Sequence, residues 1–260
     1  MRCRALAAAG ALLVGGACAS PHLECTAGVA APFRWTDGFE DAAVVNDLLP
    51  ADESRWTSTQ LQGNAENALS IVSAPVHGGT SSLRTHAGAY DGFTASKADV
   101  GKGGLSFGCE QDFWASVWLF IEGNANTENL FLLDVEVANN SGSPGRRVYL
   151  TGGDAVLACD AGKFPVAAST VRQPRGQEKS LAKNQWTHLE LHLHLSDDET
   201  RGLVEAWQDD VKVLDANSRT LPLNDVRFDR VQVGLTANGN TAQPHTLFVD
   251  DVTISNQALR

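Results

Sequence analysis

Short runs of alternating apolar and polar residues, separated by glycine, asparagine, aspartate and proline, dominate this chain from Trp35 onward. A period of two places one side of a strand in a core and the other side in water or a cleft. The clearest runs cover residues 68–72, 113–121, 130–137, 186–195, 203–208, 226–235 and 246–254. No stretch has convincing helical spacing, although residues 41–49 are compatible with one short helix. The sequence therefore predicts an all-β domain over residues 34–256, built as a two-sheet antiparallel sandwich.

The alternation also assigns side chains to the two faces of individual strands. In the run 186–195 one face carries only leucines, whereas the other is polar and carries His188, Glu190, His192 and His194. In the run 130–137 the same rule groups Phe131 with Leu133, Val135 and Val137, and opposes them to Leu130, Leu132, Asp134 and Glu136. Which face of the histidine strand is exposed stays open at this stage.

The first eighteen residues have the composition of an export signal. Arg2 and Arg4 precede an apolar run over residues 5–14, and small residues lead to Cys18. The run is too short to span a bilayer, so a cleaved signal is predicted. Cleavage before Cys18 is typical of bacterial lipoproteins and is favoured, which predicts lipidation of Cys18 and an outer-membrane or cell-surface location. Cleavage after Ala19 would instead release a soluble periplasmic or extracellular protein.

Residues 19–33 contain small residues and two prolines without periodicity, which predicts a flexible tether. The formal net charge is −11, and removing the two arginines of residues 1–18, which hold no acid, leaves −13 for the rest. An acidic chain is a poor partner for nucleic acid, because phosphate binding depends on clustered lysine and arginine. The same charge favours neutral over polyanionic glycans.

After cleavage before Cys18 and lipidation of that residue, Cys25, Cys109 and Cys159 are the cysteines left with a thiol. In an oxidising compartment three cysteines favour one disulfide with one cysteine left over. Cys109 precedes one strand pattern and Cys159 ends another, so a Cys109–Cys159 disulfide is predicted. The alternative is that all three are free, and the role of Cys25 is undetermined.

Three segments together resemble the concanavalin A-like jelly rolls, a group that includes lectins, laminin-G-like modules, polysaccharide lyases and laminarinase-type glucanases. The first is Asp-Gly-Phe-Glu-Asp at 37–41, followed by Trp56 and by Gly-Gly-Thr-Ser-Ser-Leu-Arg at 78–84. The second is Gln-Trp-Thr-His-Leu-Glu-Leu at 185–191, which leads to Val-Glu-Ala-Trp-Gln-Asp-Asp at 204–210. The third is the closing strand Leu-Phe-Val-Asp-Asp-Val-Thr-Ile at 247–254. The resemblance implies a jelly-roll sandwich but no single function, since this fold carries binding and several chemistries.

The resemblance also implies a metal site. In related sandwiches an early glutamate and an aspartate of the last strand often share a structural calcium ion, and Glu40 and Asp250 occupy these positions. Two carboxylates with backbone carbonyls can supply the oxygens that calcium needs. The alternative is that Asp250 points inward and accepts hydrogen bonds from backbone or tryptophan donors.

Laminarinase-type hydrolases carry Glu-x-Asp-x-Glu on one strand, with the first glutamate as nucleophile. Here Asp134 and Glu136 match the second and third positions, but Leu132 stands at the first. A retaining hydrolase needs two carboxylates across the sugar bond, so the pattern argues against hydrolysis. A lyase would need a base and a group that neutralises a uronate carboxylate, for which Arg147, Tyr149 and His192 are candidates.

These observations favour a tethered carbohydrate-binding jelly roll without catalytic turnover. Its predicted glycan-contacting residues are Arg147, Tyr149, His192 and Trp207, because they offer flat rings and hydrogen-bonding groups. One alternative is a polysaccharide lyase that acts on uronic-acid glycans. Another is a structural envelope or adhesion protein. The sequence determines neither the identity of the glycan, nor the presence of turnover, nor the oligomeric state.

Overall fold

The structure is a computed structural model that describes residues 31–138, 142–240 and 243–260. The predicted signal segment, the Cys18 lipidation site and residues 19–30 of the predicted tether lie outside the described residues. Within the described ranges, no helix is long and apolar enough to cross a membrane.

Fifteen strands make up almost all of the regular structure in these ranges. They are β1 Arg34–Asp37, β2 Ser58–Gln62, β3 Ala68–Val72, β4 Ser82–Ala87, β5 Ser96–Lys102, β6 Asp112–Ile121, β7 Leu130–Glu136, β8 Gly145–Thr151, β9 Val156–Gly162, β10 Val171–Arg172, β11 Trp186–His194, β12 Leu203–Gln208, β13 Val211–Asn217, β14 Arg230–Asn238 and β15 His245–Ser255. A single 3-10 turn, η1 at Val45–Leu48, falls within residues 41–49, where a short helix was expected.

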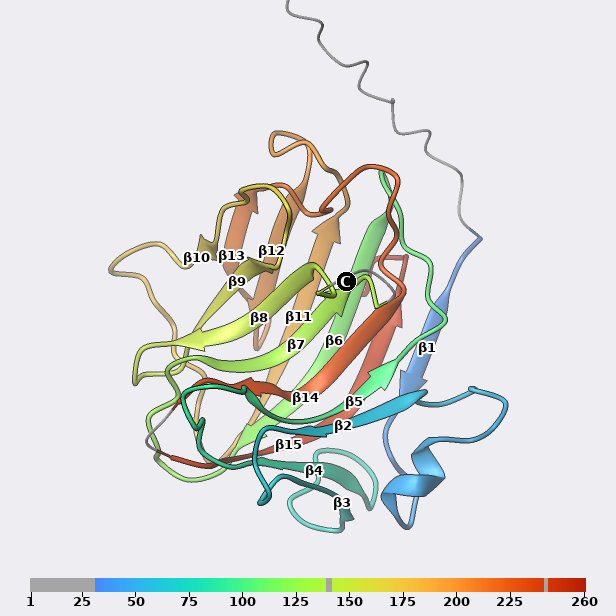
Figure 1. Cartoon of the computed structure of the whole chain (residues 1–260), viewed down its shortest axis with the longest axis vertical. Helices are drawn as coiled ribbons and strands as arrows, with labels where there is room; N and C mark the ends of the chain where they lie inside the picture. The colour runs from blue at the N-terminus through green and yellow to red at the C-terminus, as the bar shows by residue number, and fades with distance from the viewer. Residues whose placement is uncertain (1–30, 139–141, 241–242) are drawn as a thin grey trace, which may run out of the picture.

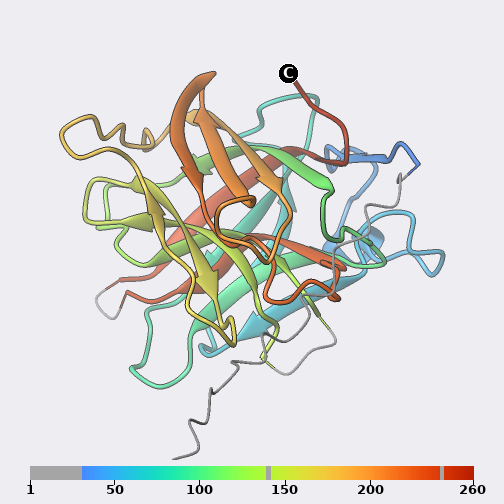
Figure 2. The same ribbon diagram turned by 90° about the horizontal axis from the view of Figure 1, so that it is seen from above.

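The strands form two antiparallel sheets that lie face to face as separate layers (Figures 1 and 2). The eight-stranded sheet has the order β13-β12-β11-β6-β15-β4-β3, with β1 paired to β15. The seven-stranded sheet has the order β10-β9-β8-β7-β14-β5-β2 and lies in front in Figure 1. This arrangement confirms the predicted concanavalin A-like jelly roll.

The core lies between the two sheets and is filled by the apolar side of each alternating strand. In β11, Leu189, Leu191 and Leu193 are almost fully buried, as the period-two pattern predicted. From the opposite sheet, Val148 and Leu150 are also fully buried. The polar sides of both sheets consequently point away from each other, on opposite surfaces of the molecule.

Strand β7 departs from simple alternation. Its pairing with β8 shifts register between Phe131 and Leu133, which is a β-bulge centred on Leu132. Phe131 lies opposite Tyr149 and Asp134 lies opposite Arg147, so Phe131 shares its face with Asp134. The prediction that Phe131 lies with Leu133 and Val135 was therefore wrong. One extra residue in a strand moves everything before it to the other face.

The predicted Cys109–Cys159 disulfide is also wrong. Cys109 is disulfide-bonded, but Cys159 is a free, fully buried thiol in β9. Burial raises the pKa of the Cys159 thiol to about 11, so the thiol is neutral. Arg146, fully buried like Cys159, donates a hydrogen bond of 3.0 Å to the Ser169 carbonyl and one of 2.6 Å to the Ser218 hydroxyl.

Candidate functional site

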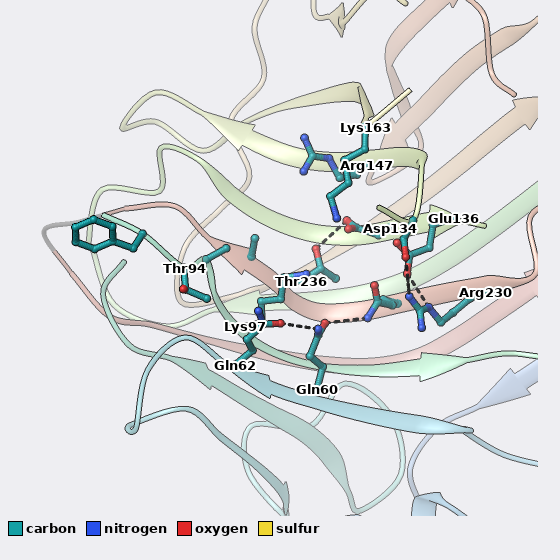
Figure 3. A pocket seen from close by; sticks show the side chains of 15 residues that line it. Gln60, Gln62, Thr94, Lys97, Asp134, Glu136, Arg147, Lys163, Arg230 and Thr236 are labelled. Atoms are coloured by element: carbon teal, nitrogen blue, oxygen red, sulfur yellow. Dashed lines mark hydrogen bonds and ion pairs between the residues drawn. The ribbon is translucent and has the colours of Figure 1, made fainter. Parts of the chain in front are cut away.

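A cavity of about 410 Å³ opens on the outer surface of the seven-stranded sheet, which we call the cavity face (Figure 3). Strands β2, β5, β7, β8 and β14 supply its floor, and the loop before β5 supplies part of its rim. The lining residues are Gln60, Gln62, Phe93, Thr94, Ala95, Lys97, Asp134, Glu136, Ser143, Arg147, Lys163, Arg230, Gln232, Thr236 and Ala237. A polar cavity with groups from five strands is the most developed candidate for a binding site.

The local sequence explains why these polar side chains face outward together. In β14, Val231 and Val233 are fully buried in the core, so Arg230 and Gln232 must point to the other side. Antiparallel pairing then places Gln232 opposite Asp134 of β7 and beside β5 on its other edge. The floor is thus the sum of several polar strand faces that register brings side by side.

Asp134 lies at the centre of the floor and is only 6% exposed. Burial raises its pKa to about 6, although the Arg147 guanidinium and a hydrogen bond act in the opposite direction. That hydrogen bond is donated by the Thr236 hydroxyl to the Asp134 carboxylate over 2.8 Å (Figure 3). A carboxyl group with a pKa near neutrality can exchange a proton under physiological conditions.

The two arginines of the cavity already have carboxylate partners. Arg147 donates to Asp160 from Nε over 2.9 Å and from Nη2 over 2.7 Å. Arg230 donates from Nε to Glu136 over 2.6 Å (Figure 3). In each pair the carboxylate balances the charge of the arginine. The two arginines are therefore less available than an unpaired cation to bind an external anion.

The two lysines of the cavity differ from the arginines. Neither Lys97 of β5 nor Lys163, which follows β9, forms an ion pair with any residue in the described part of the chain. Lys97 acts on Asp134 electrostatically and lowers its pKa, against the larger effect of burial. The cavity therefore holds two available cations together with a carboxyl group that can exchange protons.

Asp99 lies on the same side of β5 as Lys97 and is fully buried. Its Oδ1 atom accepts a hydrogen bond of 2.8 Å from the Gln232 amide, whereas its Oδ2 atom has no partner among the described residues. Burial raises the pKa of Asp99 well above its ordinary value, with the neighbouring Asp134 and Glu136 adding to the effect. Burial thus favours the neutral form of Asp99, whose carboxyl group holds the Gln232 amide in place.

The four predicted glycan-contacting residues do not form one site. Arg147 and Tyr149 belong to β8 on the cavity face, whereas His192 and Trp207 belong to β11 and β12 in the other sheet. Only Arg147 lines the cavity. Tyr149 is 7% exposed and stacks on Phe131 at 4.9 Å, and burial raises the pKa of its phenol. The prediction of a single site from these residues was wrong, because sheet membership was not visible in the alternation.

His192 and Trp207 instead belong to the outer surface of the eight-stranded sheet, which we call the histidine face after His188, His192 and His194. Both rings stack on Trp114, at 4.1 Å for His192 and 5.8 Å for Trp207. The Arg260 guanidinium lies 4.6 Å from the Trp207 ring, and Trp207 is only 9% exposed. A ring covered in this way offers no open platform to a sugar.

Two of the three histidines that name this face, His192 and His194, contact carboxylates. His192 contacts Glu205 through Nδ1 at 2.7 Å and Asp112 through Nε2 at 3.0 Å. Burial alone would lower the pKa of His192, but these two contacts outweigh it and raise the pKa. The acids are neighbours on β6 and β12, so the contacts join three adjacent strands.

Glu40 and Asp250, predicted to bind calcium, both hold the turn at residues 77–81. Thr80 donates to Glu40 from its backbone N–H and its hydroxyl, each over 2.8 Å. The backbone N–H of His77 donates to Asp250 over 2.9 Å. These contacts fit the hydrogen-bonding alternative for the two carboxylates. No group of three or more metal-ligating side chains occurs in the described ranges, and the calcium site stays a prediction.

Sequence reasoning missed most of the cavity. Lys97, Lys163, Arg230, Gln60 and Gln232 were not singled out. The polar alternation of Arg230 and Gln232 with two buried valines was a usable signal, and Gln60 with Gln62 was another. Lys163 lies in a loop after β9, where no periodicity could have indicated its position.

The fold and the cavity define a jelly-roll domain with a charged cavity on the outer surface of one sheet. A family model described as polysaccharide lyase matches residues 50–253, and the chain belongs to this family. A search of curated proteins finds no significant match.

Solved structures share the fold at low sequence identity. The endo-β-1,4-glucuronan lyase from the fungus Trichoderma reesei is 18% identical, with a TM-score of 0.62 over 78% of this chain and 91% of that one. The cellulose-induced protein Cip1 is 15% identical, with a TM-score of 0.57 over 85% and 97%. The alginate lyase Aly36B is 9% identical, with a TM-score of 0.53 over 89% and 99%. At these identities the similarity shows the fold.

Proposed function

We propose that this protein is a polysaccharide lyase that cleaves uronic-acid glycans by β-elimination in the cavity of the seven-stranded sheet. One observation carries the proposal: Lys97 and Lys163, without ion-pair partners among the described residues, share a cavity with Asp134, whose pKa is about 6. The family match and the two lyases among the structural neighbours support it. Both favour the lyase alternative over binding without turnover.

The substrate's carboxylate determines where the cations are needed. A uronate carboxylate would bind the ammonium groups of Lys97 and Lys163, which have no competing carboxylate partner. These cations would stabilise the negative charge that develops on the carboxylate when the neighbouring proton leaves. The local cations thus reverse the preference for neutral glycans that the acidic net charge of the chain suggested.

The elimination itself needs a base and a proton donor. In its ionised form Asp134 removes the proton at C5, and the electron pair of the C5–H bond becomes the C4–C5 double bond. The bond from C4 to the glycosidic oxygen breaks, and that oxygen takes a proton from one of the two ammonium groups. Tyr149 is the weaker base candidate, since it lies outside the cavity lining and its pKa is raised.

The test is an ultraviolet assay for unsaturated product with polyglucuronate and with alginate, and with a cello-oligosaccharide as the neutral control. We expect product from an acidic glycan only, and a loss of about 100-fold or more in rate for Lys97→Met. Lys179→Met is the matched control, because Lys179 lies outside this cavity and contacts Asp209 at 3.6 Å. Binding of acidic glycan without product would return the protein to the class of binding modules. If the wild type shows neither binding nor product, the proposed function is refuted.

A further inference from the structure

One aromatic side chain at the cavity has no packing partner. Phe93, in the loop between β4 and β5, is 92% exposed, whereas the next most exposed large apolar residues, Val44 and Leu61, are 57% and 56% exposed. An isolated exposed apolar residue is ordinary. Phe93 differs because it lines the cavity that the proposed function uses, and it is the one aromatic residue in the described lining.

The loop that carries Phe93 is anchored by the three residues at 89–91, which precede the short turn at Phe93. The carboxylate of Asp91 accepts hydrogen bonds from the backbone N–H groups of Phe93 and Thr94, each over 2.8 Å. The Tyr90 N–H donates to the Asn240 carbonyl over 2.9 Å, and the Asn64 amide donates to the Ala89 carbonyl over 3.1 Å. The ring is therefore presented to solvent from a turn that its own backbone contacts hold in place.

The position of the loop relative to the charged floor is also defined. Figure 3 shows Thr94, the next residue after Phe93, at the opposite end of the cavity from Glu136 and Arg230. Phe93 precedes Lys97 by four residues, so their Cα atoms are at most about 14 Å apart. A glycan held at Lys97 would thus extend past Phe93 with a neighbouring sugar of the same chain.

The cavity floor lacks what a sugar ring needs besides its charges. Pyranose rings present apolar C–H faces, and aromatic rings are the side chains that cover such faces best. The rest of the lining is polar or charged apart from two alanines, Ala95 and Ala237. Phe93 is the group in this site able to bury an apolar sugar face.

We infer that Phe93 is a substrate-binding residue that stacks on a sugar of the acidic glycan beside the residue bound by Lys97. This inference rests on the proposed function and adds an apolar subsite to it. The contact is made away from the bond that breaks, so it contributes equally to ground state and transition state. Uniform binding of that kind lowers KM without raising kcat.

The experiment compares Phe93→Ala and Phe93→Trp with the wild type, using polyglucuronate and alginate over a range of concentrations. We expect Phe93→Ala to raise KM about tenfold at unchanged kcat, and Phe93→Trp to keep the wild-type KM. Leu223→Ala is the matched control, because Leu223 is 44% exposed and lies outside the cavity lining. Melting temperatures should be equal in all four proteins, since the Phe93 ring is not packed.

Two outcomes would overturn the inference, and they are distinguishable. Wild-type turnover with an unchanged KM in Phe93→Ala would reject the subsite and leave the lyase proposal intact. An absence of both turnover and calorimetric binding in the wild type, with either acidic glycan, would reject the lyase proposal and the subsite with it. If the wild type binds without turnover, the affinity ratio of Phe93→Ala to wild type decides the subsite in the same way.

Discussion

The two outer surfaces of the sandwich are built from the same kind of alternating strand, yet they differ in how completely their charges are paired. On the histidine face, His192 lies between Asp112 and Glu205, and Arg260 contacts Glu190 at 2.5 Å. On the cavity face, Lys97 and Lys163 lack such partners among the described residues. Pairing offsets the charges of the first surface, whereas the second keeps charge available for an external anion.

One aromatic residue of the cavity face, Phe93, differs from the rings of the histidine face in the same way. Trp114 and Trp207 of the histidine face are each 9% exposed and stacked, whereas Phe93 of the cavity face is 92% exposed. Aromatic rings and charged groups in a sequence therefore indicate a glycan site only where the rings are exposed and the charges have no partner. The comparison teaches that the two surfaces differ in which side chains lack a partner, and not in the types of residue that they carry.

The largest expected effect comes from Asp134→Asn on the cavity face. The amide cannot act as a base, so kcat should fall about 100- to 10,000-fold. In the wild type, kcat/KM should rise with pH through about 6, as Asp134 ionises. Initial rates across pH check both points, and a variant that retains turnover would exclude Asp134 as the base.

The same substitution should not cost stability, which sharpens the contrast between the faces. The folded pKa of Asp134 is raised from 3.8 to about 6, so its contribution to stability is present below 3.8 and is lost as pH rises through 6. Removing the charge should therefore raise the free energy of unfolding above pH 6, by up to about 3 kcal/mol. Urea denaturation above pH 6 measures this free energy. A lower value for the variant than for the wild type would contradict the raised pKa of Asp134.

On the histidine face, His192→Asn should show the reverse behaviour, with stability lost and turnover unchanged. Asp112 and Glu205 would lose a charged partner, at a cost of about 1–3 kcal/mol. The raised pKa of His192 means that its contribution is complete below pH 6.5 and is lost as pH rises through the folded pKa. Denaturation curves of wild type and variant should differ below pH 6.5. They should converge at high pH, above the folded pKa of His192.

The matched control is His188→Asn on the same strand. Burial lowers the pKa of His188, so any contribution from this residue is present at high pH and is lost as pH falls. The two variants should therefore differ from the wild type in opposite pH ranges. Equal pH profiles would show that the acids around His192 have no specific role.

A smaller effect is expected at the turn that Glu40 and Asp250 hold, which is tied to the histidine face by the His77 ring on Trp118 at 3.6 Å. Gly79 has φ +59, and an added Cβ would lie 2.2 Å from a Glu40 carboxylate oxygen. Gly79→Ala should cost about 1–2 kcal/mol from the left-handed backbone alone, plus the displacement of Glu40.

Gly104→Ala is the control for that turn, because Gly104 has φ +72 and open space around its Cβ position. Gly104→Ala should lose only the stability that the left-handed backbone costs, because no side chain such as Glu40 has to be displaced. Turnover should be unchanged in both variants. A fall in kcat for Gly79→Ala would show that the two faces communicate.

The smallest expected effect is that of a chelator. The backbone N–H groups aimed at Glu40 and Asp250 leave these carboxylates hydrogen-bonded without a metal. The melting temperature should therefore be the same with and without a calcium chelator. A decrease would support the calcium site that the family resemblance implies, since an ion bound by the folded state stabilises it.

Much of the fold was predictable, because alternation is a local property of the chain. The runs at 68–72 and 203–208 became β3 and β12 with the same bounds, and the run at 113–121 became β6 with one more residue. Strand β2 was not among the predicted strands, because Leu61 is its one apolar residue. The β-bulge at Leu132 also escaped, because it depends on the pairing of β7 with its neighbours.

The site was less predictable, because it depends on which strands become neighbours. Asp134 and Arg147 are cross-strand neighbours in the structure, and Gln232 reaches them only through the pairing of β14 with β7. His192 has a similar character in the sequence but lies on the other sheet. Alternation indicates which side of a strand is polar, and it does not indicate which sheet the strand joins.

The buried thiol of Cys159 is a natural probe of local opening of the sheet around β9. A reagent such as iodoacetamide reacts with the thiolate, and a fully buried thiol with a pKa of about 11 reaches neither solvent nor that form while β9 stays paired. Labelling at this position therefore proceeds only through transient separation of the strands around it. Its rate across denaturant concentrations gives the free energy of that opening without an engineered probe, at a core residue that is not part of the cavity lining.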